Sequence, residues 1–208
     1  MKKDNRGFSL IEFIIVVCIM AILLGVMAAS ISRIAGFRAK ECRNKVISSL
    51  ENGRLMTLSK SRGGTWVSDP NAKTYLVFVR NETDGCNYCI TVIEGDIYDV
   101  KKVSKGGVVL KYSTVKDATD GTPVGVCVTG KKGLGIGTDP AILANCVSAG
   151  TKVAFNRQNG SFLSYDSAGN VYPYHFFASL GNYNYGISLH PSTGKVEVGA
   201  RTRVTTSP

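Results

Sequence analysis

Histidine, tryptophan and charged residues are scarce in this chain of 208 residues. It contains two histidines, His175 and His190, one tryptophan, Trp66, and only 19% charged residues. At 44% hydrophobic residues it is too apolar for an intrinsically disordered chain. It has no H-E-x-x-H, G-x-S-x-G or G-x-x-x-x-G-K-[ST] motif. We therefore expect no enzyme, no catalytic residue, no cofactor and no metal, and we interpret His175, in an aromatic strand, as a structural residue.

One long apolar run near the N-terminus dominates the sequence pattern. It covers residues 8–29, contains Glu12 as its one charge, and follows the basic residues Lys2, Lys3 and Arg6. As a helix the run would be about 33 Å long, enough to cross a bilayer core. A cleaved secretory signal and a plain membrane anchor are the ordinary interpretations. The run is longer than a usual signal core, and neither interpretation explains a carboxylate in hydrocarbon, which costs roughly 2.5–3.5 kcal/mol.

Residues 7–12, Gly-Phe-Ser-Leu-Ile-Glu, resemble the processing site of type IV pilins and of the pseudopilins of type II secretion. The resemblance implies that prepilin peptidase cuts between Gly7 and Phe8, that Phe8 becomes N-methylated, and that the apolar run is retained. Glu12 would then serve assembly. The freed α-amine is mostly cationic at neutral pH, so Glu12 can pair with its own amine or with that of the next subunit. Because an unpaired buried charge is costly, this pair would favour one axial register between helices.

The same resemblance implies partners and a location. The partners are prepilin peptidase, other pilin or pseudopilin subunits in a helical filament, an inner-membrane assembly platform, and membrane lipid before assembly. Basic residues flank the apolar run on both sides, so charge asymmetry does not decide its orientation. The family's peptidase works on the cytoplasmic side. We therefore expect a single-pass protein of the cell membrane with its head outside the cytoplasm, which then enters a pilus or pseudopilus.

The chain divides into four parts by pattern. Residues 1–7 are the expected leader, 8–29 the transmembrane half of a stalk helix, 30–61 its amphipathic half, and 62–208 a β-rich head. Apolar residues in the amphipathic half recur at three- and four-residue steps: Ile31, Ile34, Ala39, Cys42, Val46, Leu50 and Gly53. Gly63-Gly64 should end a single helix of about 53 residues, roughly 80 Å long.

From Trp66 onward the hydrophobic period becomes two, which predicts strands. The candidates are residues 74–80, 89–94, 97–103, 108–112, 124–129, 152–157, 161–165, 174–178, 186–190 and 195–198. Asn159-Gly160 predicts a two-residue hairpin turn, and residues 191–194 predict another hairpin. The fold class is therefore α+β, with one long N-terminal helix packed on an antiparallel sheet.

The order of elements in the head resembles the GspH/FimT type of minor pilin and pseudopilin. The residues that carry this resemblance are 50–56 at the helix end, 153–160, 187–189 and 193–198. Some FimT-type pilins bind DNA through a basic C-terminal Gly-Arg-x-Arg segment. The tail here reads Gly-Ala-Arg-Thr-Arg at 199–203, which differs from that pattern by one residue. Lys195, Arg201 and Arg203 are the candidate DNA contacts. The alternative is a solvated, frayed tail.

Six cysteines require an account. Cys18 in the apolar run and Cys42 on the apolar stripe are expected to be buried thiols. Four others lie in the head, where two disulfides are expected, Cys86–Cys89 and Cys127–Cys146. A redox C-x-x-C and a zinc site are the alternatives. A redox motif needs a helix start at its first cysteine, whereas Asp84-Gly85 indicates a turn there. A zinc site of this type needs two C-x-x-C pairs, and the sequence has one.

Three functions remain open from the sequence. The first is a structural minor pilin or pseudopilin, assembled into a type IV pilus or a type II secretion pseudopilus. The second is the same scaffold as a DNA-binding minor pilin in DNA uptake. The third is a membrane-anchored extracellular adhesin or enzyme.

Overall fold

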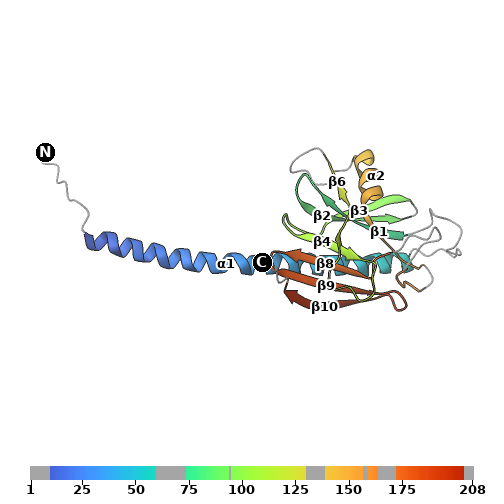
Figure 1. Ribbon diagram of the computed structural model, residues 1–208. Coiled ribbons are helices and arrows are strands. Elements are labelled where there is room, and N and C mark those ends of the chain that lie inside the picture. Colours follow the sequence, from blue (N-terminus) through green and yellow to red (C-terminus); the bar gives the residue numbers. More distant parts are fainter. Residues whose placement is uncertain are drawn as a thin grey trace.

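A single helix of 50 residues, α1 (Leu10–Ser59), runs the length of the molecule. The computed structural model describes residues 10–59, 74–93, 95–129, 139–156, 159–163 and 172–203. At 1.5 Å per residue, α1 is about 75 Å long. Its first half extends away from the head, and its second half lies against the strands (Figure 1). The prediction of one continuous helix is confirmed within this range, whereas Gly63-Gly64 lies outside the described residues.

The strands form two sheets, so the fold is α+β as predicted. The first sheet has the order β3-β2-β1-β6, with β7 also paired to β1, and the second has the order β10-β9-β8-β4-β5. The strand bounds are β1 Thr74–Asn81, β2 Cys86–Ile93, β3 Asp96–Lys102, β4 Val109–Ser113, β5 Thr122–Pro123, β6 Val126–Cys127, β7 Thr151–Ala154, β8 His175–Leu180, β9 Tyr183–His190 and β10 Lys195–Arg203. All named pairings are antiparallel except β1 with β6.

The C-terminal half of α1 packs against both sheets through one stripe. Ala39, Cys42, Val46 and Leu50 are fully buried, and Gly53 lies so close to β1 that an added Cβ would be 3.1 Å from Leu76. These positions were predicted. Ile34 was also placed on the stripe, but it is 49% exposed because it precedes the part of α1 that the head covers.

Two apolar cores lie on opposite faces of the first sheet. The larger core joins α1 to both sheets, and there the Phe78 and Phe176 rings lie 4.8 Å apart. The smaller core packs the other face of β1 and β2 against a second helix, α2 (Pro140–Ala149), through Leu143 and Cys146. Because both faces are covered, β1 shows a nearly continuous apolar run instead of strict alternation.

Helix α2 was not predicted. It begins at Asp139, whose side chain accepts a hydrogen bond from the Ala141 N–H, and Pro140 occupies its first turn. Both features are ordinary helix-start signals. The helix has only ten residues and two buried positions, Leu143 and Cys146. Its apolar pattern is therefore too short to be recognised in the sequence.

Three predicted strands differ from the structure. Of the strand expected at 124–129 only β6 forms, and Gly125 before it passes so close to the Ala149 carbonyl that no side chain fits there. The strands expected around Asn159-Gly160 shrink to β7 and a single bridge between Phe155 and Phe162. The Asn156 N–H donates to the Ser161 carbonyl, and the Gly160 N–H donates to the Asn156 carbonyl, so the turn is longer than the predicted two residues. The hairpin at 191–194 is confirmed, with Gly194 at φ 65°.

Candidate functional site

The N-terminal half of α1 presents its apolar side chains on every side. Leu10–Met27 is long and apolar enough to cross a membrane, and none of this segment is buried within the protein. Its large residues, such as Leu10, Phe13 and Leu24, are 63–79% exposed. A helix that is apolar all round requires lipid or other helices around it. This segment is therefore the part of the chain with the greatest need of partners.

Glu12 lies in the first turn of α1, inside this apolar segment. An acidic side chain is favoured there because the unpaired N–H groups of a helix start carry partial positive charge. Its side chain is exposed on the outside of the rod, where a neighbouring helix can reach it. The predicted processing residues, Gly7 and Phe8, lie outside the described residues.

The disulfide predicted between Cys127 and Cys146 is present. Its Cα atoms are 5.1 Å apart, and it joins β6 to α2 at the edge of the smaller core. It therefore closes the loop that contains the Gly-rich residues 130–137, which lie outside the described residues.

The predicted Cys86–Cys89 disulfide is wrong. Both residues belong to β2 and are free thiols. Residues three apart in a strand point to opposite faces and have Cα atoms about 10 Å apart, beyond the roughly 7 Å a disulfide allows. Cys86 thus belongs to the smaller core and Cys89 to the larger one. The strand also contradicts a redox C-x-x-C, and the described residues contain no group of three metal-ligating side chains.

The thiols of Cys42 and Cys89 lie in the larger core. Burial raises the pKa of each to about 12, so both are protonated at neutral pH. They behave as small apolar side chains, as was expected for Cys42. Cys18, which was also expected to be buried, is exposed on the isolated chain because it lies on the uncovered rod.

Removing the disulfide is expected to destabilise the head. The two cysteines are 19 residues apart in the sequence. In the double variant Cys127→Ser with Cys146→Ser the loop between them is no longer closed, and losing a disulfide that closes a loop of this size lowers the unfolding free energy by about 3 kcal/mol. The measurement is denaturant unfolding of the detergent-solubilised full chain, with and without reductant. Reductant should destabilise the parent protein by clearly more than it destabilises the double variant. Equal stability of the two proteins would contradict this prediction.

The basic C-terminal segment is part of a strand. β10 pairs with β9 as far as Arg203, opposite Tyr183, with a bulge between Val198 and Arg201. This contradicts a tail frayed from residue 199. The register places Lys195 opposite His190, Arg201 opposite Tyr185 and Arg203 opposite Tyr183. Lys195 also donates a 2.9 Å hydrogen bond to Glu197.

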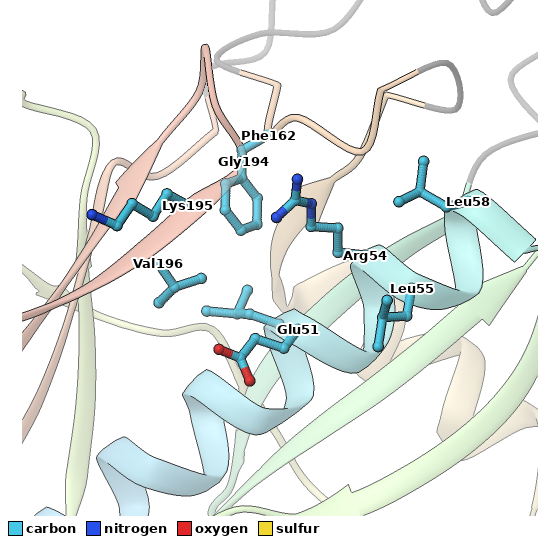
Figure 2. A pocket seen from close by; sticks show the side chains of 9 residues that line it. Glu51, Arg54, Leu55, Leu58, Phe162, Gly194, Lys195 and Val196 are labelled. Carbon is cyan, nitrogen blue, oxygen red and sulfur yellow. The ribbon is translucent and has the colours of Figure 1, made fainter.

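A hollow of about 660 Å³ lies between the end of α1 and the β9–β10 turn. Figure 2 shows the Arg54 side chain directed toward the turn at Gly194, with the Glu51 carboxylate on the other side of the hollow. The Arg54 guanidinium donates to the Thr193 carbonyl at 3.4 Å, and Leu55 and Leu58 line the rim. An added Cβ at Gly194 would lie 2.5 Å from the Gly160 carbonyl oxygen, so the turn requires glycine. The Arg54–Thr193 hydrogen bond thus joins the hairpin to the helix beside the hollow. The hollow was not predicted, because its walls come from three segments that are distant in the sequence.

Both histidines have partners. His175 lies between the Ser188 hydroxyl at 3.1 Å and the Lys116 carbonyl at 2.5 Å, and His190 lies 3.1 Å from a Glu197 carboxylate oxygen. His175 is half-buried in β8, in agreement with a structural role.

The comparisons with known proteins match one segment of the chain. The family model of the prokaryotic N-terminal methylation motif matches residues 2–28. No curated protein and no solved structure matches the chain. The matched segment contains the predicted cleavage site, Glu12 and the apolar half of α1. The motif supports processing by prepilin peptidase, assembly with other pilin subunits and attachment to a membrane through the apolar helix. The chain therefore carries the N-terminal signature of the type IV pilins and pseudopilins.

Proposed function

We propose that this protein is a structural, non-enzymatic minor subunit of a type IV pilus or a type II secretion pseudopilus. The observation that carries the proposal is the continuity of α1, whose first half bears the methylation motif and exposes apolar side chains on all sides, and whose second half is held by the head. A cleaved signal would not need to continue as a rigid helix into the folded domain. A retained helix serves as a rod along which copies or relatives of the subunit pack.

The assembly step rests on Glu12 and the new N-terminus. After cleavage the cationic amine of Phe8 lies four residues before Glu12, about one helical turn away. In hydrocarbon each charge is costly alone, and pairing them removes most of that cost. Two helices that share this pair are fixed in axial register. On this proposal the head lies outside the cytoplasm, and the assembly platform draws the subunit out of the membrane.

The N-terminus of the native protein tests this proposal. Mass spectrometry of the chain from its native cells should find a mature protein that begins at Phe8 with a methylated α-amine. A protein that begins at Met1, or well beyond Ala29, would overturn the proposal. Capture of the tagged subunit from sheared filaments, with identification of co-purifying subunits, distinguishes a pilus from a secretion pseudopilus.

DNA binding is the second candidate, and the pairing of β10 as far as Arg203 favours it. A strand presents its basic residues at fixed spacing, whereas a frayed end would have to be ordered on binding. In this candidate Arg201 and Arg203 contact phosphates without reading base sequence. Lys195, whose ammonium is bonded to the Glu197 carboxylate, contributes less.

A gel-shift assay tests the DNA candidate. The double variant Arg201→Ala with Arg203→Ala should weaken binding of double-stranded DNA, and the affinity should fall steeply with salt because each phosphate contact releases counterions. Lys195→Ala is the matched control and should have the smaller effect. Binding that is absent, or that does not depend on salt, would remove DNA from the list of partners.

A further inference from the structure

Four polar side chains meet on the outer face of the first sheet, at the turn that begins β2. They are Asp84, Cys86, Tyr88 and Lys102, and none has a role in the proposed function. Lys102 ends the edge strand β3 and lies directly opposite Tyr88 in the β2–β3 register. Residues two apart in a strand share a face, so Lys102 and Cys86 lie on the same side of the sheet. The two strands thus bring an amine and a thiol together.

The Lys102 ammonium lies beside Asp84 and Tyr88, on the face of the sheet that carries Cys86. Its Nζ lies 3.8 Å from Asp84 Oδ2 and 5.9 Å from the centre of the Tyr88 ring. A side-chain hydrogen bond with Cys86 is the main cause that raises the pKa of Lys102. Asp84 is itself fixed, because its carboxylate accepts hydrogen bonds from the Tyr88 hydroxyl and from the Cys86 N–H.

The Cys86 thiol differs in its surroundings from the other free thiols of the head that the structure describes. Cys86 is 3% exposed, and its sulfur donates to the Asp84 carbonyl at 3.4 Å, beside the Lys102 cation. Cys89, by contrast, lies among apolar side chains of the larger core. Oxidants attack cysteine as the thiolate, and reactive cysteines lie beside cationic groups rather than in apolar surroundings. A small oxidant such as dioxygen can reach a sulfur at this depth, whereas a bulky thiol reagent cannot.

We propose that Cys86 and Lys102 are a modification site at which dioxygen forms a covalent nitrogen–oxygen–sulfur cross-link between β2 and β3. One thiolate, one ammonium and one dioxygen give the Sγ–O–Nζ bridge and one water. The sulfur and the nitrogen each lose two electrons, and dioxygen takes up all four. One oxygen atom enters the bridge, and the other leaves as water with two of the three ammonium hydrogens.

The cross-link would fix the exposed edge of the first sheet. β3 pairs only with β2 in the described part of the chain, and its pairing is already interrupted by a register shift near Thr91. Edge strands of this kind open first in local unfolding. The disulfide fixes the opposite side of the same core, where β6 meets α2. With the cross-link and the disulfide together, covalent bonds would join the elements around the smaller core at two of its edges.

Peptide mass spectrometry of the detergent-solubilised full chain tests the proposal. One sample is kept in air, and another is kept anaerobic with reductant; both are unfolded, alkylated and digested with chymotrypsin. The aerobic sample should yield peptides 79–88 and 99–110 joined, with a mass equal to their sum plus one oxygen atom minus two hydrogen atoms. Reduction should separate them and restore the alkylated Cys86. The proposal is overturned if the joined peptide is absent and Cys86 is alkylated equally in both samples, or is found as a sulfinic acid or in a disulfide.

Two lysine variants provide the matched comparison. Lys102→Arg keeps the positive charge but removes the amine, so the joined peptide should disappear while Cys86 remains available to the alkylating agent. Lys101→Arg changes the adjacent lysine, which lies opposite Cys89 on the other face of the sheet, and should keep the joined peptide. A joined peptide that survives in Lys102→Arg would also overturn the assignment. Because Lys102 is half exposed, the arginine is not expected to disturb the fold.

Discussion

A Glu12→Val variant is expected to be exported and cleaved normally but almost absent from filaments. Valine leaves the apolar run uninterrupted and does not touch the Gly7–Phe8 bond, so processing should continue. Loss of the carboxylate leaves the mature α-amine without its partner in an apolar environment, which costs about 3–5 kcal/mol. Since each 1.4 kcal/mol is a factor of ten, incorporation should fall by about two to three orders of magnitude. The measurement is the ratio of subunit in sheared filaments to subunit in the membrane.

Two variants make this experiment specific. Glu12→Asp keeps the charge on a side chain that is one methylene shorter, and it should restore part of the incorporation. Glu51→Gln removes an exposed acid from the far end of the same helix, in the hollow by the β9–β10 turn, and should leave incorporation unchanged. The N-terminus of the Glu12→Val protein must still be methylated Phe8. Normal incorporation of Glu12→Val would remove the pairing role from Glu12.

The helix was predictable because its signals are local. The apolar run, its one acid and the later 3–4 spacing of Ala39, Cys42 and Val46 all lie within one continuous segment. Each of these features can be recognised without knowledge of the rest of the chain. The point at which the head begins to cover α1 was not predictable in the same way. Ile34 continues the period but is half exposed, whereas Gly36, two residues later, is buried.

The cysteines show where local reasoning fails. Cys86 and Cys89 are neighbours in sequence, and an irregular loop would allow them to pair. The strand that contains them separates their sulfurs onto two faces. Cys127 and Cys146 meet because α2 lies on the outside of the first sheet, and α2 itself was missed. The cluster of Cys86 and Lys102 depends on the register of two strands, which no sequence pattern in this chain specifies.

Replacing Phe78 by alanine is expected to cause the largest loss of stability in the head. Phe78 is fully buried in the middle of β1, and its ring lies 4.8 Å from that of Phe176 on the second sheet. It therefore joins both sheets in the core that also holds Val46 and Leu50 of α1. Phe→Ala substitutions at such positions cost about 3–5 kcal/mol, because the lost apolar contacts are accompanied by a cavity that the surroundings only partly fill.

Whole domains have an unfolding free energy of about 5–15 kcal/mol, so the Phe78→Ala loss approaches the lower end of this range. Tyr98→Ala, on the edge strand β3, is the matched control, since Tyr98 is 55% exposed. Its effect should stay within about 0.5 kcal/mol, as for most surface substitutions. Denaturant unfolding of each full-length variant in the same mild detergent, followed by proteolysis of the unfolded fraction, gives both values. If the two variants lost the same stability, Phe78 would not join the two sheets in the way described.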